Sequence, residues 1–262
     1  MNLKPYPTDL TDEQWEPIAN LIPDAKPGGR PRRWNSRQLL NAICYLLRAG
    51  CAWRLLPHDF PPWQTVYRYF RRWQADATWQ RLHEVLHAGL RCADGRAETP
   101  SAAIIDSQSV KTSARGGDSG FDAGKNVQGR KRHVLVDTLG LLLGVVVTAA
   151  SVSDPAGGRL LADQVQSQLP RLELIWGDSK YGGSFREYVQ DQWGWRVETI
   201  TRPKDQEGFQ VLRRRWVVER TFAWLGRYRR LCRDYEYRTD VSETMIHVAM
   251  SHLMLGRLKT GF

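Results

Sequence analysis

The stretch RKRHVLVDTLGLLLGVVVTAA, residues 130–150, decides the fold class, because two apolar runs flank a short turn sequence. The runs Arg132–Asp137 and Leu141–Ala150 are rich in Val, which is common in strands. The residues Asp137–Gly140 (DTLG) lie between them, and Asp and Gly both favour turns. The stretch therefore predicts an antiparallel β-hairpin.

Further apolar runs bounded by glycine and charge surround this hairpin. Three of them are strand candidates: residues 102–106, 172–178 and 196–201. Apolar residues at helical spacing predict helices at about 157–169, 183–191, 209–229 and 241–258. The glycine-rich segment 115–125 predicts a surface loop. Three antiparallel strands followed by alternating helix and strand is the order of a ribonuclease-H-like domain, so we expect an α/β fold with a mixed sheet flanked by helices.

The first 92 residues have a different pattern, with apolar residues at helical spacing throughout. Helices are expected at residues 11–22, from a capping Ser36 to near Gly50, from about Trp63 to Trp73, and at residues 79–92. A helix, a turned connection and a basic aromatic helix is the layout of a helix-turn-helix. An ordinary three-helix packing unit explains the same pattern equally well. The predicted division is an all-α N-terminal domain (1–92), a linker (93–100) and the α/β domain (101–262).

The charge of the chain points to a polyanionic partner. Its 262 residues carry 38 Lys and Arg against 28 Asp and Glu, a net charge of +10, and the excess lies in the first hundred and the last sixty residues. Nine arginines lie between Arg213 and Arg238, interleaved with Trp and Tyr. Such stretches favour phosphate backbone and base stacking, which predicts a nucleic acid as the partner. A solvated basic surface is the simpler alternative.

Cysteines and hydropathy exclude other classes of protein. Cys44, Cys51, Cys92 and Cys232 form no CxxC pair, so neither a zinc ribbon nor a disulfide framework is indicated, and a reducing cytoplasm is expected. The longest apolar run, residues 139–150, is too short to span a bilayer, and the N-terminal residues MNLKPYPTDLTDEQW lack an apolar signal core, so no membrane partner is expected.

Three carboxylates are placed where chemistry is possible. Asp106 ends the first strand candidate, Asp178 ends the strand candidate 172–178, and Glu219 lies within the basic helix sequence RRRWVVER (213–220). An acid at the point where a buried strand emerges is held rigidly. Three converging acids repel one another unless a divalent cation neutralises them, which predicts Mg²⁺ or Mn²⁺. Two such ions would activate the attacking oxygen and stabilise the leaving oxygen.

Each acid taken alone also has a structural explanation, as a strand-end cap or a surface charge. Asp137 and Asp154 compete as ligands, but Asp137 fits a turn and Asp154 fits a helix start in the sequence SDP. The sequence HEVLH, residues 83–87, matches the zincin pattern HExxH. This short pattern often occurs by chance, and two packing or exposed histidines on a linker helix explain it better.

Four motifs carry a resemblance to a known family. They are IIDSQSVKT (104–112), GRKRHVLVDTLG (129–140), GDSKYGG (177–183) and RWVVERTFAWL (215–225). Together they resemble bacterial DDE transposases of the insertion sequence 5 group, over nearly the whole chain. The resemblance implies a ribonuclease-H-like catalytic domain, an N-terminal helical DNA-binding region and cut-and-paste movement of an element with terminal inverted repeats. It also implies that Asp106, Asp178 and Glu219 are the catalytic and metal-binding triad.

The family signature around the glutamate is only partly present. Arg215 and Glu219 match it, whereas Leu212 and Gly226 replace the Tyr and Lys of the pattern. Arg215 would bind a terminal phosphate or pair with Glu219, one helical turn away. Residues expected to contact DNA are Arg30, Arg32, Arg33, Arg68, Arg71, Arg72, Lys125, Arg130, Lys131, His133, Arg215, Arg220 and Arg227. For Lys125, Arg130, Lys131 and His133 a solvated strand edge is the alternative.

The resemblance predicts strand cleavage and transfer at the ends of an insertion sequence, by a homodimer or higher oligomer associated with the nucleoid in the cytoplasm. A non-catalytic DNA-binding regulator or an inactive transposase remnant is the rival hypothesis. The basic helices are compatible with both, so cleavage activity is what separates them.

Overall fold

The computed structural model describes residues 4–23, 33–114, 117–201 and 214–258. The chain forms two compact units, which are described separately. The helical unit comprises residues 1–96, 227–231 and 244–262, and the α/β unit comprises residues 97–226 and 232–243.

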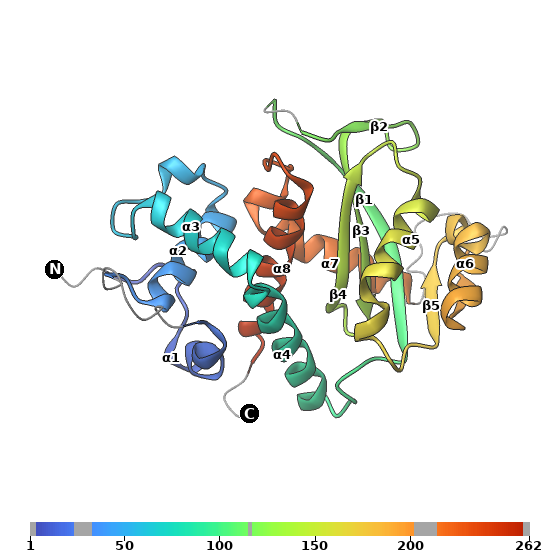
Figure 1. Ribbon diagram of the computed structural model, residues 1–262, viewed down its shortest axis with the longest axis horizontal. Coiled ribbons are helices and arrows are strands. Elements are labelled where there is room, and N and C mark those ends of the chain that lie inside the picture. Colours follow the sequence, from blue (N-terminus) through green and yellow to red (C-terminus); the bar gives the residue numbers. More distant parts are fainter. Residues whose placement is uncertain (1–3, 24–32, 115–116, 202–213, 259–262) are drawn as a thin grey trace. The chain divides into compact units, whose positions relative to one another are not determined.

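The helical unit (Figure 1) is built from short helices joined by turns. Its elements are α1 (Asp12–Trp15), η1 (Glu16–Leu21), α2 (Ser36–Ala49), η2 (Trp53–Leu55), α3 (Trp63–Ala75), α4 (Thr78–Ala93), η5 (Arg229–Leu231) and the part of α8 (Thr239–Leu255) from residue 244 onward. Leu39, Ile43, Leu46 and Leu47 form the expected apolar stripe of α2, and all four are buried. The helices expected at 63–73 and 79–92 are confirmed.

Two boundaries in this unit differ from the sequence prediction. The cap of α2 is Asn35 rather than Ser36, because the Asn35 side chain accepts the backbone N–H of Gln38. The helix expected at residues 11–22 is α-helical only in α1 and continues as a 3₁₀-helix. Pro17 lies at the start of that 3₁₀ segment, and a proline cannot donate the backbone hydrogen bond that a continuing α-helix requires.

The α/β unit contains one mixed sheet. Its strands are β1 (Ala102–Lys111), β2 (Gly120–Asp122), β3 (Val127–Asp137), β4 (Leu142–Ala149), β5 (Leu174–Gly177) and β6 (Arg196–Thr199). The order is β2-β3-β1-β5-β6, and β4 also pairs with β3. Strands β1, β3 and β4 pair antiparallel, whereas β1, β5 and β6 pair parallel. This is the ribonuclease-H-like arrangement, so the predicted fold class is confirmed.

The predicted hairpin is the pair β3–β4. Asp137 closes its turn by accepting the backbone N–H groups of Leu139 and Leu141, each at 2.9 Å. Gly140 has φ +79°, a backbone conformation that favours glycine. The prediction that Asp137 serves a turn is therefore confirmed. The segment expected to be only a surface loop contains the short strand β2, which pairs with β3.

Helices cover both faces of the sheet in Figure 1. On one face, α5 (Asp154–Val165) and α6 (Ser184–Trp193) bury a core that includes Ile105, Leu135 and Phe185. On the other face, α7 (Arg215–Gly226) packs against β1 and β3. Because successive side chains of a strand point to opposite faces, β1 directs Asp106 toward α7 and Ser107 toward α5.

No helix among the described residues is long and apolar enough to cross a membrane. All four cysteines are described, and none forms a disulfide. Cys44 is buried, and burial raises the pKa of its thiol to about 12, so it is a packing residue.

Candidate active site

Asp106 lies on β1 with its carboxylate largely buried. The backbone N–H of Ser107 donates to Asp106 Oδ1 at 2.7 Å. Burial raises the pKa of Asp106 to about 6, while the Ser107 N–H and the Arg215 guanidinium oppose this shift and the nearby Asp178 carboxylate adds to it. Burial thus disfavours the charged form of this carboxylate, and a cation bound beside it would favour that form.

Asp178 comes directly after β5 and starts the 3₁₀ turn η4 (Ser179–Gly182). Its Oδ1 accepts the backbone N–H of Lys180 at 3.0 Å. Strands β5 and β1 run parallel, with Trp176 opposite Ile104. Asp178 and Asp106 each lie two residues beyond this pair, so the sheet register brings both acids to the same edge.

Glu219 lies on α7, one turn after Arg215. The guanidinium of Arg215 is 3.9 Å from a carboxylate oxygen of Asp106 and 3.9 Å from one of Glu219. The Glu219 side chain is 54% exposed, whereas that of Asp106 is 16% exposed. Arg215 thus links the first and third predicted acids, and both contacts are long for ion pairs.

The three acids do not form a closed metal cluster. Within the described ranges, no group of three or more His, Cys, Asp or Glu is arranged to hold a metal ion. Asp106 and Asp178 still offer hard carboxylate oxygens close to each other, which is the donor chemistry that Mg²⁺ and Mn²⁺ prefer. The pair therefore fits a divalent cation, and Glu219 lies across Arg215 from it.

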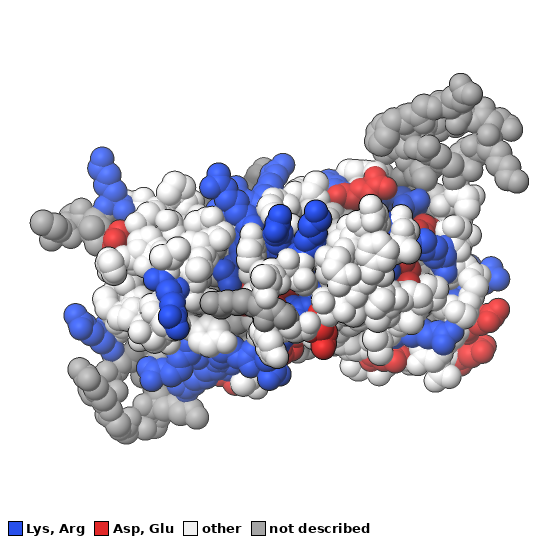
Figure 2. Space-filling model, turned by 90° about the horizontal axis from the view of Figure 1, so that it is seen from above, with Lys and Arg blue, Asp and Glu red and all other residues white. Residues whose placement is uncertain are grey.

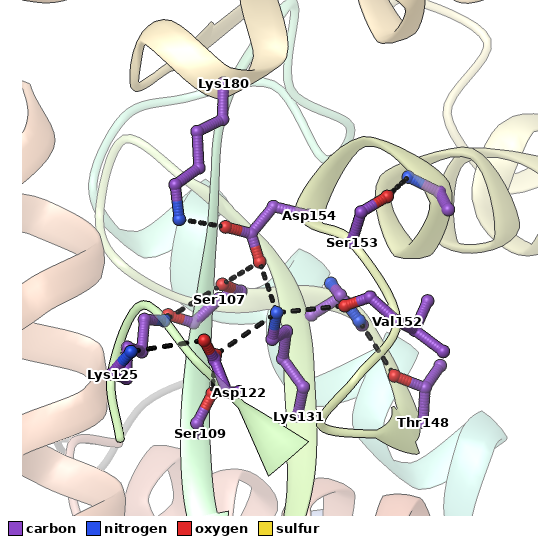
Figure 3. A network of polar contacts seen from close by, with 12 residues as sticks. Ser107, Ser109, Asp122, Lys125, Lys131, Thr148, Val152, Ser153, Asp154 and Lys180 are labelled. Carbon is purple, nitrogen blue, oxygen red and sulfur yellow. Dashed lines mark hydrogen bonds and ion pairs between the residues drawn. The ribbon is translucent and has the colours of Figure 1, made fainter. Parts of the chain in front are cut away.

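A polar network lies behind the acids, on the α5 face of the sheet (Figure 3). We call it the Lys131 network; its members are Ser107, Ser109, Asp122, Lys125, Lys131, Asp154 and Lys180. The buried ammonium of Lys131 is 3.2 Å from Asp122, 3.1 Å from Asp154 and 2.9 Å from the carbonyl oxygen of Val152.

Asp154 lies in the first turn of α5, but its side chain does not cap the helix and instead binds residues of the network. Ser153 caps α5, as its hydroxyl accepts the backbone N–H of Ala156, so the predicted helix entry is confirmed. The Asp154 carboxylate instead accepts from the Ser107 hydroxyl at 2.7 Å and from the Lys180 ammonium at 2.6 Å. Burial would raise the pKa of Asp154, but its hydrogen bonds from Lys180, Ser107 and Lys131 outweigh burial and lower it.

Three residues expected to contact DNA lie inside the protein. Arg130, Lys131 and His133 are buried on β3, which pairs with β1 on one side and β4 on the other. The alternative of a solvated strand edge is therefore wrong, because β3 is an interior strand. Arg130 pairs with Asp234 at 3.2 Å and donates to the carbonyl oxygen of Tyr237, so its charge is used within the fold.

Arg220 is also engaged within the protein. Its guanidinium lies 4.3 Å from the ring centre of Trp216 and 4.6 Å from that of Trp224, and it donates to the carbonyl oxygen of Leu139. These contacts fix α7 to the β3–β4 turn, where the Thr221 hydroxyl donates to the Gly140 carbonyl oxygen.

The other residues expected to contact DNA vary in exposure. Arg33, Arg68, Lys125 and Arg227 are exposed, and Arg71 and Arg72 are half-buried. Arg30, Arg32 and the signature position Leu212 lie outside the described residues. On the face shown in Figure 2, basic side chains dominate the helical unit, whereas acidic and basic side chains mix over the α/β unit.

The zincin-like sequence has a packing role. His83 and His87 of α4 are buried, and the His83 ring meets the ring of His247 on α8 with centroids 4.9 Å apart. Glu84, the base in a zincin, is exposed and accepts from the Gln80 side chain. The interpretation of packing histidines is confirmed.

Two family models match the chain. Residues 10–83 match "Putative transposase of IS4/5 family", and residues 97–254 match "Transposase DDE domain".

Named relatives are similar over parts of the chain. An uncharacterized 16.2 kDa protein of insertion element IS402 from Burkholderia cepacia is 37% identical over 113 residues, which are 41% of this chain and 76% of that protein. A putative transposase for insertion sequence element IS402 from the same organism is 31% identical over 122 residues, 43% of this chain and 56% of that protein.

Among solved structures, the Mos1 transposase paired-end complex with left transposon end is 13% identical and covers 67% of this chain, with a TM-score of 0.25. This chain spans 61% of the Mos1 chain. A TM-score this low supports no statement about the present protein.

Proposed function

Since the chain belongs to the transposase DDE domain family, whose model matches residues 97–254, we propose that it cleaves and transfers DNA strands at the terminal inverted repeats of an insertion sequence. The observation that supports this most directly is the pairing of β1 with β5, which brings Asp106 and Asp178 to one edge of the sheet. The polyanionic partner is double-stranded DNA, both the ends of the element and its target.

The proposed reaction uses Asp106, Asp178 and Glu219 as ligands of two Mg²⁺ or Mn²⁺ ions. When bound, these cations neutralise the acids and activate the oxygen that attacks phosphorus. The chain itself orients the ligands: the Ser107 N–H holds the Asp106 carboxylate, and the Lys180 N–H holds that of Asp178. Glu219 has more than half of its side-chain surface exposed, so a cation could reach its carboxylate from solvent.

Basic residues near the acids would bind the substrate. Arg215 lies between Asp106 and Glu219 and makes a long ion pair with each. If a phosphate bound at this edge, Arg215 would exchange these two ion pairs for a bidentate contact with the phosphate. Lys125 is exposed, and its ammonium donates to the Ser107 carbonyl oxygen beside Asp106. These two residues are proposed to hold the phosphates on either side of the reacting one.

The remaining assignments complete the proposal. Residues 1–92 would form a DNA-binding domain, joined by the linker 93–100 to the catalytic domain 101–262. Arg33, Arg68, Arg71, Arg72 and Arg227 would contact the DNA backbone. The protein would act as a homodimer or higher oligomer that pairs two ends, in the cytoplasm and in contact with the nucleoid.

The test uses the DNA that flanks this reading frame, cloned as a donor plasmid, with Mn²⁺ or Mg²⁺. We expect Asp106→Asn to abolish strand cleavage while binding of the ends is retained. Asp191→Asn, which changes an exposed aspartate of α6, is the matched control and should cut normally. Cleavage by Asp106→Asn would refute the assignment. End binding without metal-dependent nicking by the unaltered protein would instead support a DNA-binding regulator or an inactive remnant.

A further inference from the structure

The Lys131 network joins the segments that carry the two aspartates. Asp154 Oδ1 accepts from the hydroxyl of Ser107, the residue next to Asp106. Asp154 Oδ2 accepts from the ammonium of Lys180, two residues after Asp178. One buried carboxylate is therefore bonded to both segments, although β1, α5 and η4 are far apart in the sequence (Figure 3).

Each of these two segments also holds its own acid through the backbone. The Ser107 N–H donates to Asp106 Oδ1 at 2.7 Å, and the Lys180 N–H donates to Asp178 Oδ1 at 3.0 Å. A displacement of Ser107 or Lys180 would therefore move the carboxylate of the neighbouring aspartate. Asp154 is the group to which both are tied.

Lys131 keeps Asp154 in place. Its ammonium is buried, pairs with Asp154 at 3.1 Å and is fixed from the other side by the Val152 carbonyl oxygen. A buried carboxylate needs such a counter-charge. The anchor is thus rigid on the side that faces away from Asp106.

From this geometry we infer that Asp154 is a positioning residue that holds Asp106 and Asp178 at the spacing required to share a divalent cation. The inference rests on the proposed function of the two acids. Asp154 itself binds no cation in this proposal, because both of its oxygens are occupied by Ser107, Lys131 and Lys180. Its effect on the reaction passes through the two segments that it joins.

The network contains an internal control. Asp122 also pairs with Lys131, at 3.2 Å, and accepts from a β1 hydroxyl, that of Ser109, at 2.6 Å. Ser109 and Ser107 lie on the same face of the same strand, but Ser109 is not adjacent to Asp106. Asp122 and Asp154 thus share burial, counter-charge and a serine partner, and only Asp154 is tied to the segments of both aspartates.

The experiment compares four variants of the full chain: Asp154→Asn and Ser107→Ala against Asp122→Asn and Ser109→Ala. Mn²⁺ binding is measured by titration calorimetry, cleavage of the donor plasmid by gel, and folding by thermal unfolding. Loss of a group that orients metal ligands typically weakens metal binding by about tenfold or more. We expect that loss, with slower cleavage, in Asp154→Asn and Ser107→Ala, and unchanged Mn²⁺ affinity in the two controls.

The inference would be overturned if Asp154→Asn bound Mn²⁺ as tightly as Asp122→Asn and Ser107→Ala bound it as tightly as Ser109→Ala. A purely structural network predicts such similar effects for the Asp154 and Asp122 variants. Ser107→Ala keeps every ion pair of the network, so it remains informative if Asp154→Asn does not fold. Asp106→Asn separates the two proposals. If it binds Mn²⁺ and cuts normally, the assignment of Asp106 to the active site fails, and the positioning role of Asp154 fails with it. If it is inactive while Ser107→Ala behaves like Ser109→Ala, only the positioning role fails.

Discussion

The two faces of β1 hold charge in opposite ways. On the α5 face, Ser107 joins a buried network in which each carboxylate meets an ammonium or hydroxyl at 2.6 to 3.2 Å. On the α7 face, the carboxylate of Asp106 lies 3.9 Å from the guanidinium of Arg215, and the charge of Lys125 acts on it as well. One residue along the strand separates a network of short ion pairs from a carboxylate with a long one.

This difference between the two faces lets the chain hold loosely paired carboxylates without destabilising its fold. A metal site needs carboxylates whose charge is not already neutralised, and such acids are costly to bury. The α5 face supplies rigidity through tight pairs, which leaves Asp106 to be loosely paired on the other face. On the proposed function, stability and chemistry depend on opposite faces of one strand.

Removing the counter-charge of the tight face should have the largest effect. Lys131→Met would leave Asp122 buried without its ammonium and weaken the anchoring of Asp154. Breaking a buried ion pair from one side costs on the order of 3–5 kcal/mol of the free energy of unfolding. Chemical denaturation of the two proteins would measure it.

Lys180→Met is the control for that variant, because Lys180 pairs with the same Asp154 carboxylate but its side chain is 53% exposed. Exposed pairs contribute at most about 1 kcal/mol. Losses of similar size in the two variants would contradict the claim that burial makes the α5 face tight.

The next prediction tests the packing of the same face. Gly157, in the first turn of α5, lies against the buried ring of His133 on β3, and a Cβ at this glycine would overlap the ring atoms. Gly157→Ala should therefore destabilise the protein by about 1–3 kcal/mol, as overpacked cores are. Thermal unfolding would show the loss.

Gly226→Ala is the matched glycine variant, since a Cβ at the end of α7 would meet nothing within 4 Å. Alanine is the better helix former, so we expect equal or slightly higher stability. If Gly157→Ala were as stable as Gly226→Ala, α5 would have to be more loosely packed on β3 than the structure shows.

The sequence predicted the strands that carry both faces of β1. It predicted the acidic residues of the α7 face but not the polar network of the α5 face. The apolar runs and the DTLG turn predicted the hairpin. The ends of the strand candidates predicted Asp106 and Asp178. Both predictions depend on local sequence patterns alone. The Lys131 network was missed because its partners come from β1, β2, β3 and α5 and meet only through the sheet register. A lysine in the basic sequence RKRH (130–133) was predicted to be a surface charge.

One signal could have revealed the network. A strand flanked on both sides by other strands is interior, so cationic residues on it must be paired. Applied to Arg130, Lys131 and His133, that rule predicts buried partners rather than DNA contacts. The position of Glu219 relative to the other acids could not have been found in this way, because it depends on how α7 packs against β1 and β3.

Glu243, a half-buried carboxylate of α8, extends the comparison to pH. Glu243 on α8 accepts the backbone N–H of Val147 at 2.8 Å, and burial raises its pKa to about 7, with Asp240 adding to the shift and the Val147 N–H opposing it. Asp154 has ammonium partners and a lowered pKa instead. The two acids should therefore respond to pH in opposite directions.

For Glu243 the folded protein binds its proton more tightly than the unfolded chain, whose pKa is about 4.5. Its contribution to stability is complete below that value and is lost as pH rises toward 7. Glu243→Gln should remove this slope and be more stable at pH 8 by on the order of 2 kcal/mol. A wild-type-like fall in stability between pH 5 and 8 in the variant would assign the slope to another group.

The smallest effect is expected on the loosely paired face. Arg215→Gln removes a guanidinium that is 3.9 Å from both Asp106 and Glu219, and long, partly exposed ion pairs contribute at most about 1 kcal/mol. We therefore expect a change in the free energy of unfolding below about 1 kcal/mol, several times smaller than for Lys131→Met. Chemical denaturation in low salt, where surface charges are least screened, is the most demanding measurement. A loss equal to that of Lys131→Met would mean that Arg215 is as necessary to the fold as Lys131, and the contrast between the two faces of β1 would be wrong.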